Sequence, residues 1–355
     1  MAAASRRGHY ITLSLVAWTL LGTLADIWAH GQRLPETFFS PYHALFYTGY
    51  LATAIWLVRP VLAARGSGRA PSAVLPRGYG PAIAGVGVFA IGGLGDAAWH
   101  QVFGIERGID IFTSPPHLLV FAGLALMASA PLCAAWATSD APERPTLGAL
   151  LPALLSAAMV LLVVNAATLH MWGPTSSRFM SALAIERITR ELATTDRTAA
   201  LVREIATQRA IANLYLTTLT LLVPALVLLR RWRLPPGSVT LVVGLVTLLV
   251  NAVTGMFFPW IVLAGVLGAA AGDALVRALA PAPDRPERFR LFAALFPAAF
   301  WGLYLLAVHL HWGLAWTPTL WVGVIVWTAG LGLAASLAVL PTGDRPGGRS
   351  AGDER

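Results

Sequence analysis

Aspartate and histidine recur in a fixed pattern in the first third of the chain. Asp26 precedes His30 by four residues, and Asp96 precedes His100 by the same interval. Residues four apart on a helix share one face about a turn apart, so each pair can point towards a common centre. A third histidine follows each pair after a Ser-Pro step, which gives two sets of three side chains: Asp26, His30 and His43, and Asp96, His100 and His117.

Each set offers one carboxylate and two imidazoles. This donor set suits a divalent first-row metal ion and leaves coordination positions open, as in non-haem iron sites. The alternative is a hydrogen-bonded Asp–His pair at the membrane interface. Ionisable residues inside apolar helices are costly and usually functional. Because the pattern occurs twice, the sequence favours a metal site in at least one set.

Other polar residues lie at the same predicted level of the membrane. Seven of the eight histidines fall at one end of the predicted spans, and only His9 falls at the other end. We therefore expect further ligands, or hydrogen-bond partners of ligands, among four residues: Asn165, His170, His309 and His311.

The composition explains which elements must position these residues. The 355 residues are 57% hydrophobic and only 12% charged, about half the charged fraction of a soluble domain. Several apolar runs reach the roughly 20 residues that cross a bilayer. This excludes a soluble enzyme and predicts an all-α polytopic membrane protein. We expect about ten transmembrane helices, at 10–30, 42–63, 80–101, 116–137, 148–171, 210–230, 238–257, 259–279, 290–311 and 317–340.

The basic residues predict the orientation. The chain has 25 Arg and no Lys, and its net charge is +8. With the amino terminus in the cytoplasm, 17 arginines lie on the inner side, whereas the short outer loops hold only Arg33 and Arg107. The positive-inside rule therefore places both termini in the cytoplasm and the metal ligands near the outer face of the cell membrane. The arginines are explained by topology, so no nucleic acid partner is expected.

The spacing of the motifs indicates an internal duplication. Asp26 and Asp96 are 70 residues apart, and His43 and His117 are 74 residues apart. We predict that the first four spans are two copies of one helical hairpin. The predicted organisation has three parts. Residues 1–140 form a duplicated metal-binding four-helix unit, residues 141–340 form a six-helix membrane region with an outer amphipathic loop at 173–209, and residues 341–355 form a disordered tail.

The first triad resembles a known metal motif. In this triad, three residues separate Asp26 from His30, and twelve separate His30 from His43. The spacing is similar to that of the metal motif in the C subunit of the copper membrane monooxygenases, which include particulate methane and ammonia monooxygenases. The resemblance covers residues 10–135 and includes a second cluster about 70 residues later. It implies copper and oxygen chemistry, additional subunits, and a soluble copper or electron donor.

We therefore expect a membrane oxidoreductase, a monooxygenase-like enzyme that activates oxygen against an apolar substrate from the lipid bilayer. Copper is the first choice of metal, and iron and zinc are the alternatives. A metal transporter or metal store remains open, although copper(I) pathways favour Met and Cys, of which the chain has six and one. A zinc-dependent membrane enzyme also remains open. We expect the first triad to form the better site, because sixteen residues, not twelve, separate His100 from His117.

Overall fold

The computed structural model describes residues 5–32, 34, 40–70, 73–106, 108–138, 142–254 and 258–341. Helices are the regular elements of the described part. The predicted tail at 341–355 lies outside it apart from residue 341.

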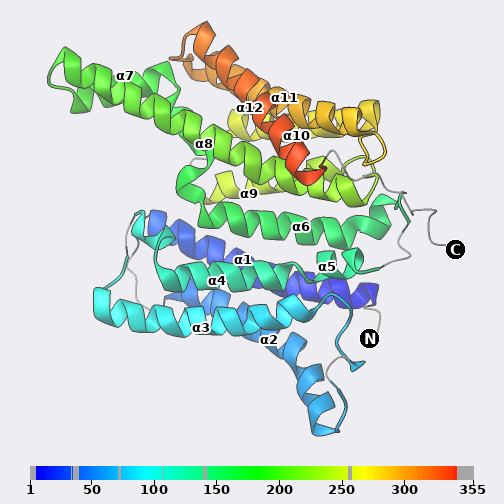
Figure 1. Cartoon of the computed structure of the whole chain (residues 1–355). Coiled ribbons are helices and arrows are strands. Elements are labelled where there is room, and N and C mark those ends of the chain that lie inside the picture. Colours follow the sequence, from blue (N-terminus) through cyan, green and yellow to red (C-terminus); the bar gives the residue numbers. More distant parts are fainter. Residues whose placement is uncertain are drawn as a thin grey trace, which may run out of the picture.

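The first half contains six α-helices: α1 (Arg6–Gly31), α2 (Pro41–Gly66), α3 (Gly80–Phe103), α4 (Pro115–Ala128), α5 (Ala130–Trp136) and α6 (Leu147–Ala167). The second half contains α7 (Ala182–Leu192), α8 (Asp196–Arg231), α9 (Leu245–Val253), α10 (Pro259–Leu279), α11 (Pro286–Trp312) and α12 (Pro318–Val339). Short helices lie between them: η2 (Asp110–Phe112), η3 (Leu169–Met171), η4 (Gly173–Phe179) and the π-helical η5 (Thr240–Gly244). In Figure 1, α1–α5 lie together on one side of α6, and α8 and α10–α12 lie on the other.

Among the described residues, eight helices are long and apolar enough to cross a membrane, and a ninth span results if α4 and α5 are counted together. The prediction of ten spans is therefore confirmed only in part. The α4–α5 pair is bent by 46°, at a point where Pro131 has no N–H to continue the helix.

The predicted span at 238–257 is the one that falls short. Its helix covers only Thr240–Val253, and residues 255–257 lie outside the described part. It nevertheless runs antiparallel to α10, because Asp273 near the end of α10 accepts hydrogen bonds from the backbone N–H groups of Val239 and Thr240. Thr247 lies against Gly265, further along the same pair of helices.

The segment predicted as an outer amphipathic loop, 173–209, is helical for most of its length. It contains η4 and α7, and its last part belongs to α8, which continues without a break through 36 residues. At 1.5 Å per residue this helix is about 54 Å long, well beyond the roughly 30 Å hydrocarbon layer, so α8 extends past the membrane.

Glycines bring the helices of each amino-terminal hairpin into close contact. A β-carbon on Gly22 of α1 would lie 2.6 Å from the backbone nitrogen of Phe46 in α2. A β-carbon on Gly92 of α3 would lie 2.7 Å from the backbone nitrogen of Val120 in α4. Each glycine is one helical turn before the aspartate of its motif, so a close backbone approach lies next to the candidate ligands in each hairpin.

Candidate metal centre

The structure gathers the residues of each motif into a separate cluster. The first cluster consists of Asp26, His30 and His43. Asp26 Oδ2 is 3.4 Å from His30 Nε2, and Asp26 Oδ1 is 3.4 Å from His43 Nε2. The three side chains are 16%, 9% and 7% exposed, so a carboxylate and two imidazoles converge in a largely buried place.

Local sequence explains how His43 reaches this position. Ser40 is the N-cap of α2, and its hydroxyl accepts a hydrogen bond from the backbone N–H of His43 at 3.1 Å. Pro41 follows at the first helical position, where the missing N–H costs nothing. The Ser-Pro step therefore fixes the start of α2, and the histidine lies in its first turn.

The second cluster contains a residue that the sequence did not reveal. Asp96, His100 and His117 are joined by Glu106. Glu106 Oε2 lies 2.7 Å from His100 Nε2, and the Glu106 side chain is only 8% exposed. Glu106 comes from the segment after α3, which ends at Gly104 with a φ of 80°, a left-handed conformation that favours glycine.

His117 is oriented by hydrogen bonding on the far side of its ring. Its Nδ1 lies 2.9 Å from the carbonyl oxygen of Ile111 and 2.9 Å from the hydroxyl of Ser114. Because a carbonyl can only accept, Nδ1 carries a proton. In the neutral imidazole, Nε2 then presents its lone pair, as in most metal-bound histidines. That Nε2 lies 3.0 Å from Asp96 Oδ1. Two acceptors at this distance need a proton or a metal ion between them.

The buried carboxylates support the same conclusion. Glu106 Oε1 is buried and has no hydrogen-bond partner among the described residues, which is costly for a charged oxygen. Asp96 Oδ1 is also buried, and it faces the imidazole nitrogens of His117 at 3.0 Å and His100 at 3.5 Å. A cation would compensate this cost. In each cluster the donor atoms lie within 4.8 Å of one another. An ion with bonds of about 2.0–2.2 Å needs only a small inward movement of these side chains, so the residues present fit a first-row metal.

Tyr47 lies between the first cluster and helix α3. Its ring contacts His43 of the first cluster, with 6.2 Å between ring centroids. Its hydroxyl donates a hydrogen bond of 3.5 Å to the carbonyl of Gly93, three residues before Asp96 on α3. The two candidate sites therefore lie on neighbouring, directly packed hairpins.

The four additional candidates belong to neither cluster in the described part of the chain. Asn165 donates a hydrogen bond to Leu161 and accepts one from Thr220 of α8, so its amide joins two helices. His309 and His311 lie at the end of α11, and the ring of His311 contacts Trp260 and Trp312.

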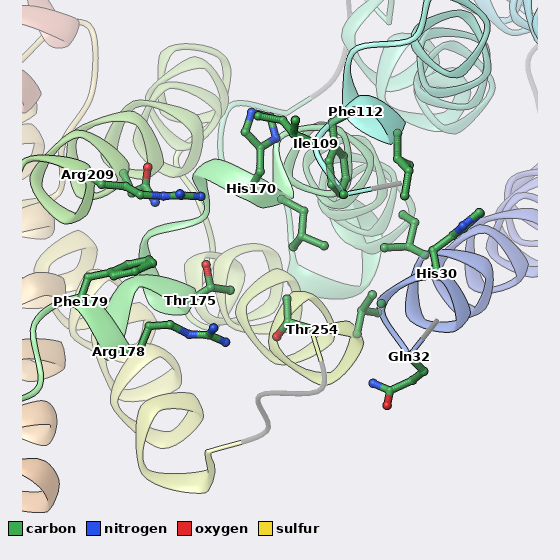
Figure 2. A pocket seen from close by; sticks show the side chains of 17 residues that line it. His30, Gln32, Ile109, Phe112, His170, Thr175, Arg178, Phe179, Arg209 and Thr254 are labelled. Carbon is green, nitrogen blue, oxygen red and sulfur yellow. The ribbon is translucent and has the colours of Figure 1, made fainter. Parts of the chain in front are cut away.

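His170 lies in η3 and contacts Phe112, with 5.3 Å between ring centroids. It lines a cavity that His30 also lines, and Figure 2 shows the His30 imidazole pointing away from the centre of this cavity. The cavity is therefore adjacent to the first cluster and distinct from it.

One feature of the sequence indicates that the second cluster could contain a further donor such as Glu106: the length of the second motif. Sixteen residues separate His100 from His117, against twelve in the first motif. The longer segment supplies a fourth donor. We expected the first triad to be the better site, but the geometry favours the second cluster, which has the additional carboxylate.

Comparisons of this chain with protein-family models, with curated protein sequences and with solved structures give no match. The structure shows a helical polytopic membrane protein with two groups of His and carboxylate side chains that could hold a metal ion.

Proposed function

We propose that this chain is an integral membrane metalloprotein whose two clusters bind copper or non-haem iron, and that it oxidises an apolar substrate with dioxygen. The observation that carries the proposal is the second cluster, where two buried carboxylates and two histidines converge. There Asp96 Oδ1 lies 3.0 Å from His117 Nε2, and Glu106 Oε1 is buried without a hydrogen-bond partner among the described residues. A bound redox metal with open coordination positions would supply the dioxygen activation.

The roles of the chain's own residues follow from their positions. Asp26, His30 and His43 would hold one ion, and Asp96, His100, Glu106 and His117 the other. Ile111 fixes the ring of His117, and Ser40 fixes the backbone of His43. Imidazole and carboxylate donors suit copper(II), iron or zinc better than copper(I). The resemblance of the first triad to copper membrane monooxygenases favours copper there, and the extra carboxylate of Glu106 makes iron a stronger candidate in the second cluster.

The close contacts of glycines support the proposal of an internal duplication. Gly22 and Gly92, 70 residues apart, each approach the backbone of the returning helix. Gly49 and Gly123, 74 residues apart, approach the backbone of the preceding helix in the same way. These are the offsets that relate the aspartates and the second histidines. Two helical hairpins derived from one ancestor would have this arrangement.

We also propose that both termini lie in the cytoplasm and that the clusters lie near the outer face of the cell membrane. Three arginines make contacts at the end of the helices opposite the clusters. Arg6 donates to the carbonyl of Gly148, Arg231 to that of Thr138, and Arg230 to that of Val339. Concentration of arginine at one end supports a cytoplasmic assignment for that end. The outer position of the clusters would allow delivery of metal or electrons by further subunits or by a soluble donor.

Metal analysis and electron paramagnetic resonance of the purified full-length protein test this function. The proposal predicts stoichiometric copper or iron and a paramagnetic signal that changes when the reduced protein is exposed to dioxygen. Stoichiometric zinc would contradict the redox proposal and favour a zinc-dependent membrane enzyme. Metal that exchanges readily across a vesicle membrane, with no reaction with dioxygen, would favour a transporter or store instead.

A further inference from the structure

A cavity of about 600 Å³ opens between the amino-terminal helices and the carboxyl-terminal half of the protein. Its walls come from the end of α1, the η2 region, η3, η4, α8 and the end of α9. Figure 2 shows His30 and Gln32 on one side and Arg178, Phe179 and Arg209 on the other. Ligand pockets usually have volumes of about 300–1,000 Å³, so this cavity can hold a small organic molecule.

One side of the cavity is positively charged. Arg178 of η4 and Arg209 of α8 both line it, and in Figure 2 their guanidinium groups extend towards its centre. No Asp or Glu is among the described residues that line it. Burial lowers the pKa of Arg178, and the charge of Arg209 lowers it further. Both guanidinium groups therefore contribute positive charge to the same side of the cavity, which favours an anion there.

The arginines are held in place by the packing around them. The guanidinium carbon of Arg209 lies 5.3 Å from the centre of the Phe179 ring, a cation–π contact. The backbone N–H of Gly173, at the start of η4, donates to Thr217 at 2.7 Å, and Asn213 donates to Ser176 at 2.8 Å. The segment that carries Arg178 is thus tied to α8, and a binding site built on fixed elements loses less entropy when a ligand binds.

The other side of the cavity is apolar. Ile27, Ile109, Phe112 and Leu169 contribute hydrocarbon and aromatic surface. His170 lies on the same wall, and its buried Nδ1 has no hydrogen-bond partner. One wall therefore favours hydrocarbon, the opposite wall favours negative charge, and a polar nitrogen remains to be satisfied.

We propose that this cavity binds an amphiphilic anion, with its carboxylate or phosphate group between Arg178 and Arg209 and its apolar body against the wall formed by Ile109, Phe112 and Leu169. Guanidinium groups pair with planar or tetrahedral oxyanions through paired N–H donors. The site goes beyond the proposed metal chemistry and does not require either cluster to hold a metal. The ligand could be a free amphiphile or the headgroup region of an anionic lipid.

Calorimetric titration of the full-length protein in phosphatidylcholine nanodiscs tests the proposal, with empty nanodiscs as the blank. Octanoate should bind at least about tenfold more tightly than octanol of the same chain length, because a charge-assisted hydrogen bond is typically worth a factor of this size or more. Octyl phosphate should compete with octanoate. Equal binding of octanoate and octanol would overturn the proposal without any variant being needed.

Substitutions locate the site. Arg178→Gln and Arg209→Gln should each weaken octanoate binding about three- to tenfold and leave octanol binding unchanged. The expected factor is modest because both side chains are exposed, and solvent screens their charge. Arg203→Gln is the matched control, because Arg203 is also exposed on α8 but does not line the cavity. Octanoate binding by the folded double variant at wild-type affinity would refute the assignment. The metal content of the same samples is measured separately, so failure of this site and failure of the metal proposal are distinguishable.

A second arm identifies the source of the anion. In nanodiscs that contain phosphatidylglycerol, the lipid should reduce octanoate affinity if a lipid headgroup enters the cavity. Unchanged octanoate affinity in these nanodiscs would indicate a free amphiphile. Both results are compatible with the anion site, whose existence depends on the comparison of octanoate with octanol.

Discussion

Alanine at Gly92 should separate the helices of the second hairpin at the level of its candidate ligands. The added β-carbon would lie 2.7 Å from the backbone nitrogen of Val120 and 3.0 Å from the carbonyl oxygen of Pro116. These are backbone atoms, so α3 and α4 must move apart by about 0.7 Å, and overpacking of this kind costs about 1–3 kcal/mol. Gly92 is one turn before Asp96, and Pro116 directly precedes His117. Metal sites require ligand distances within about 0.2 Å of ideal values, so the second cluster should lose most of its metal.

Two measurements check this expectation: the number of metal ions per chain, by inductively coupled plasma mass spectrometry, and the midpoint of thermal unfolding. Gly92→Ala should lose the metal of the second cluster and unfold at a lower temperature. Gly87→Ala on the same helix is the control, because its β-carbon meets nothing within 4 Å. Gly22→Ala should affect the first cluster in the corresponding way. If Gly92→Ala keeps wild-type metal content and the wild-type unfolding midpoint, the close approach of α3 and α4 does not position the ligands.

Three further predictions follow from the fold and the clusters. Glu106→Gln keeps the side-chain volume but removes a charged donor, so chelator competition should show metal affinity in the second cluster lowered by at least about 10–100-fold, whereas Glu186→Gln, at an exposed ion pair on α7, should have no effect. Asp273→Ala removes the acceptor of three hydrogen bonds at the start of η5 and should destabilise the protein by about 1–3 kcal/mol in denaturant titrations; an unchanged midpoint would contradict the role of Asp273. A tag inserted between residues 185 and 195 should be labelled from outside intact cells and a C-terminal reporter should be cytoplasmic, and the reverse pattern would overturn the proposed orientation.

The candidate ligands could be predicted from the sequence because their geometry is local. Asp26 and His30 share a helix face through a spacing of four residues, and the Ser-Pro step sets the first turn of α2 and hence the position of His43. Glu106 could not be predicted in this way. Its position depends on the path of the chain after Gly104 and on the packing of that segment against α3, which no periodicity encodes.

The helix boundaries were likewise predictable from the sequence only where they depend on local features. Long apolar runs gave most of the spans, since about 20 residues are needed to cross a bilayer. Hydropathy did not reveal that α8 is continuous, because its charged beginning and apolar end look like separate elements. The stretch from Asp196 to Arg231 contains no glycine and one proline, Pro224, and this lack of helix breakers was the available signal. The short helix at Thr240–Val253 depends on its pairing with Asp273, a tertiary contact.

The most direct test of the central claim is the metal content of full-length protein that lacks one histidine from each cluster. Wild-type protein should hold one metal ion per cluster, His30→Ala and His100→Ala should each lose one, and the double variant should hold none while remaining folded and monodisperse. Wild-type protein that stays metal-free after incubation with copper, iron or zinc would contradict the claim. A folded double variant with the wild-type metal content would also contradict it, and the Asp–His pairs would then be interfacial hydrogen bonds.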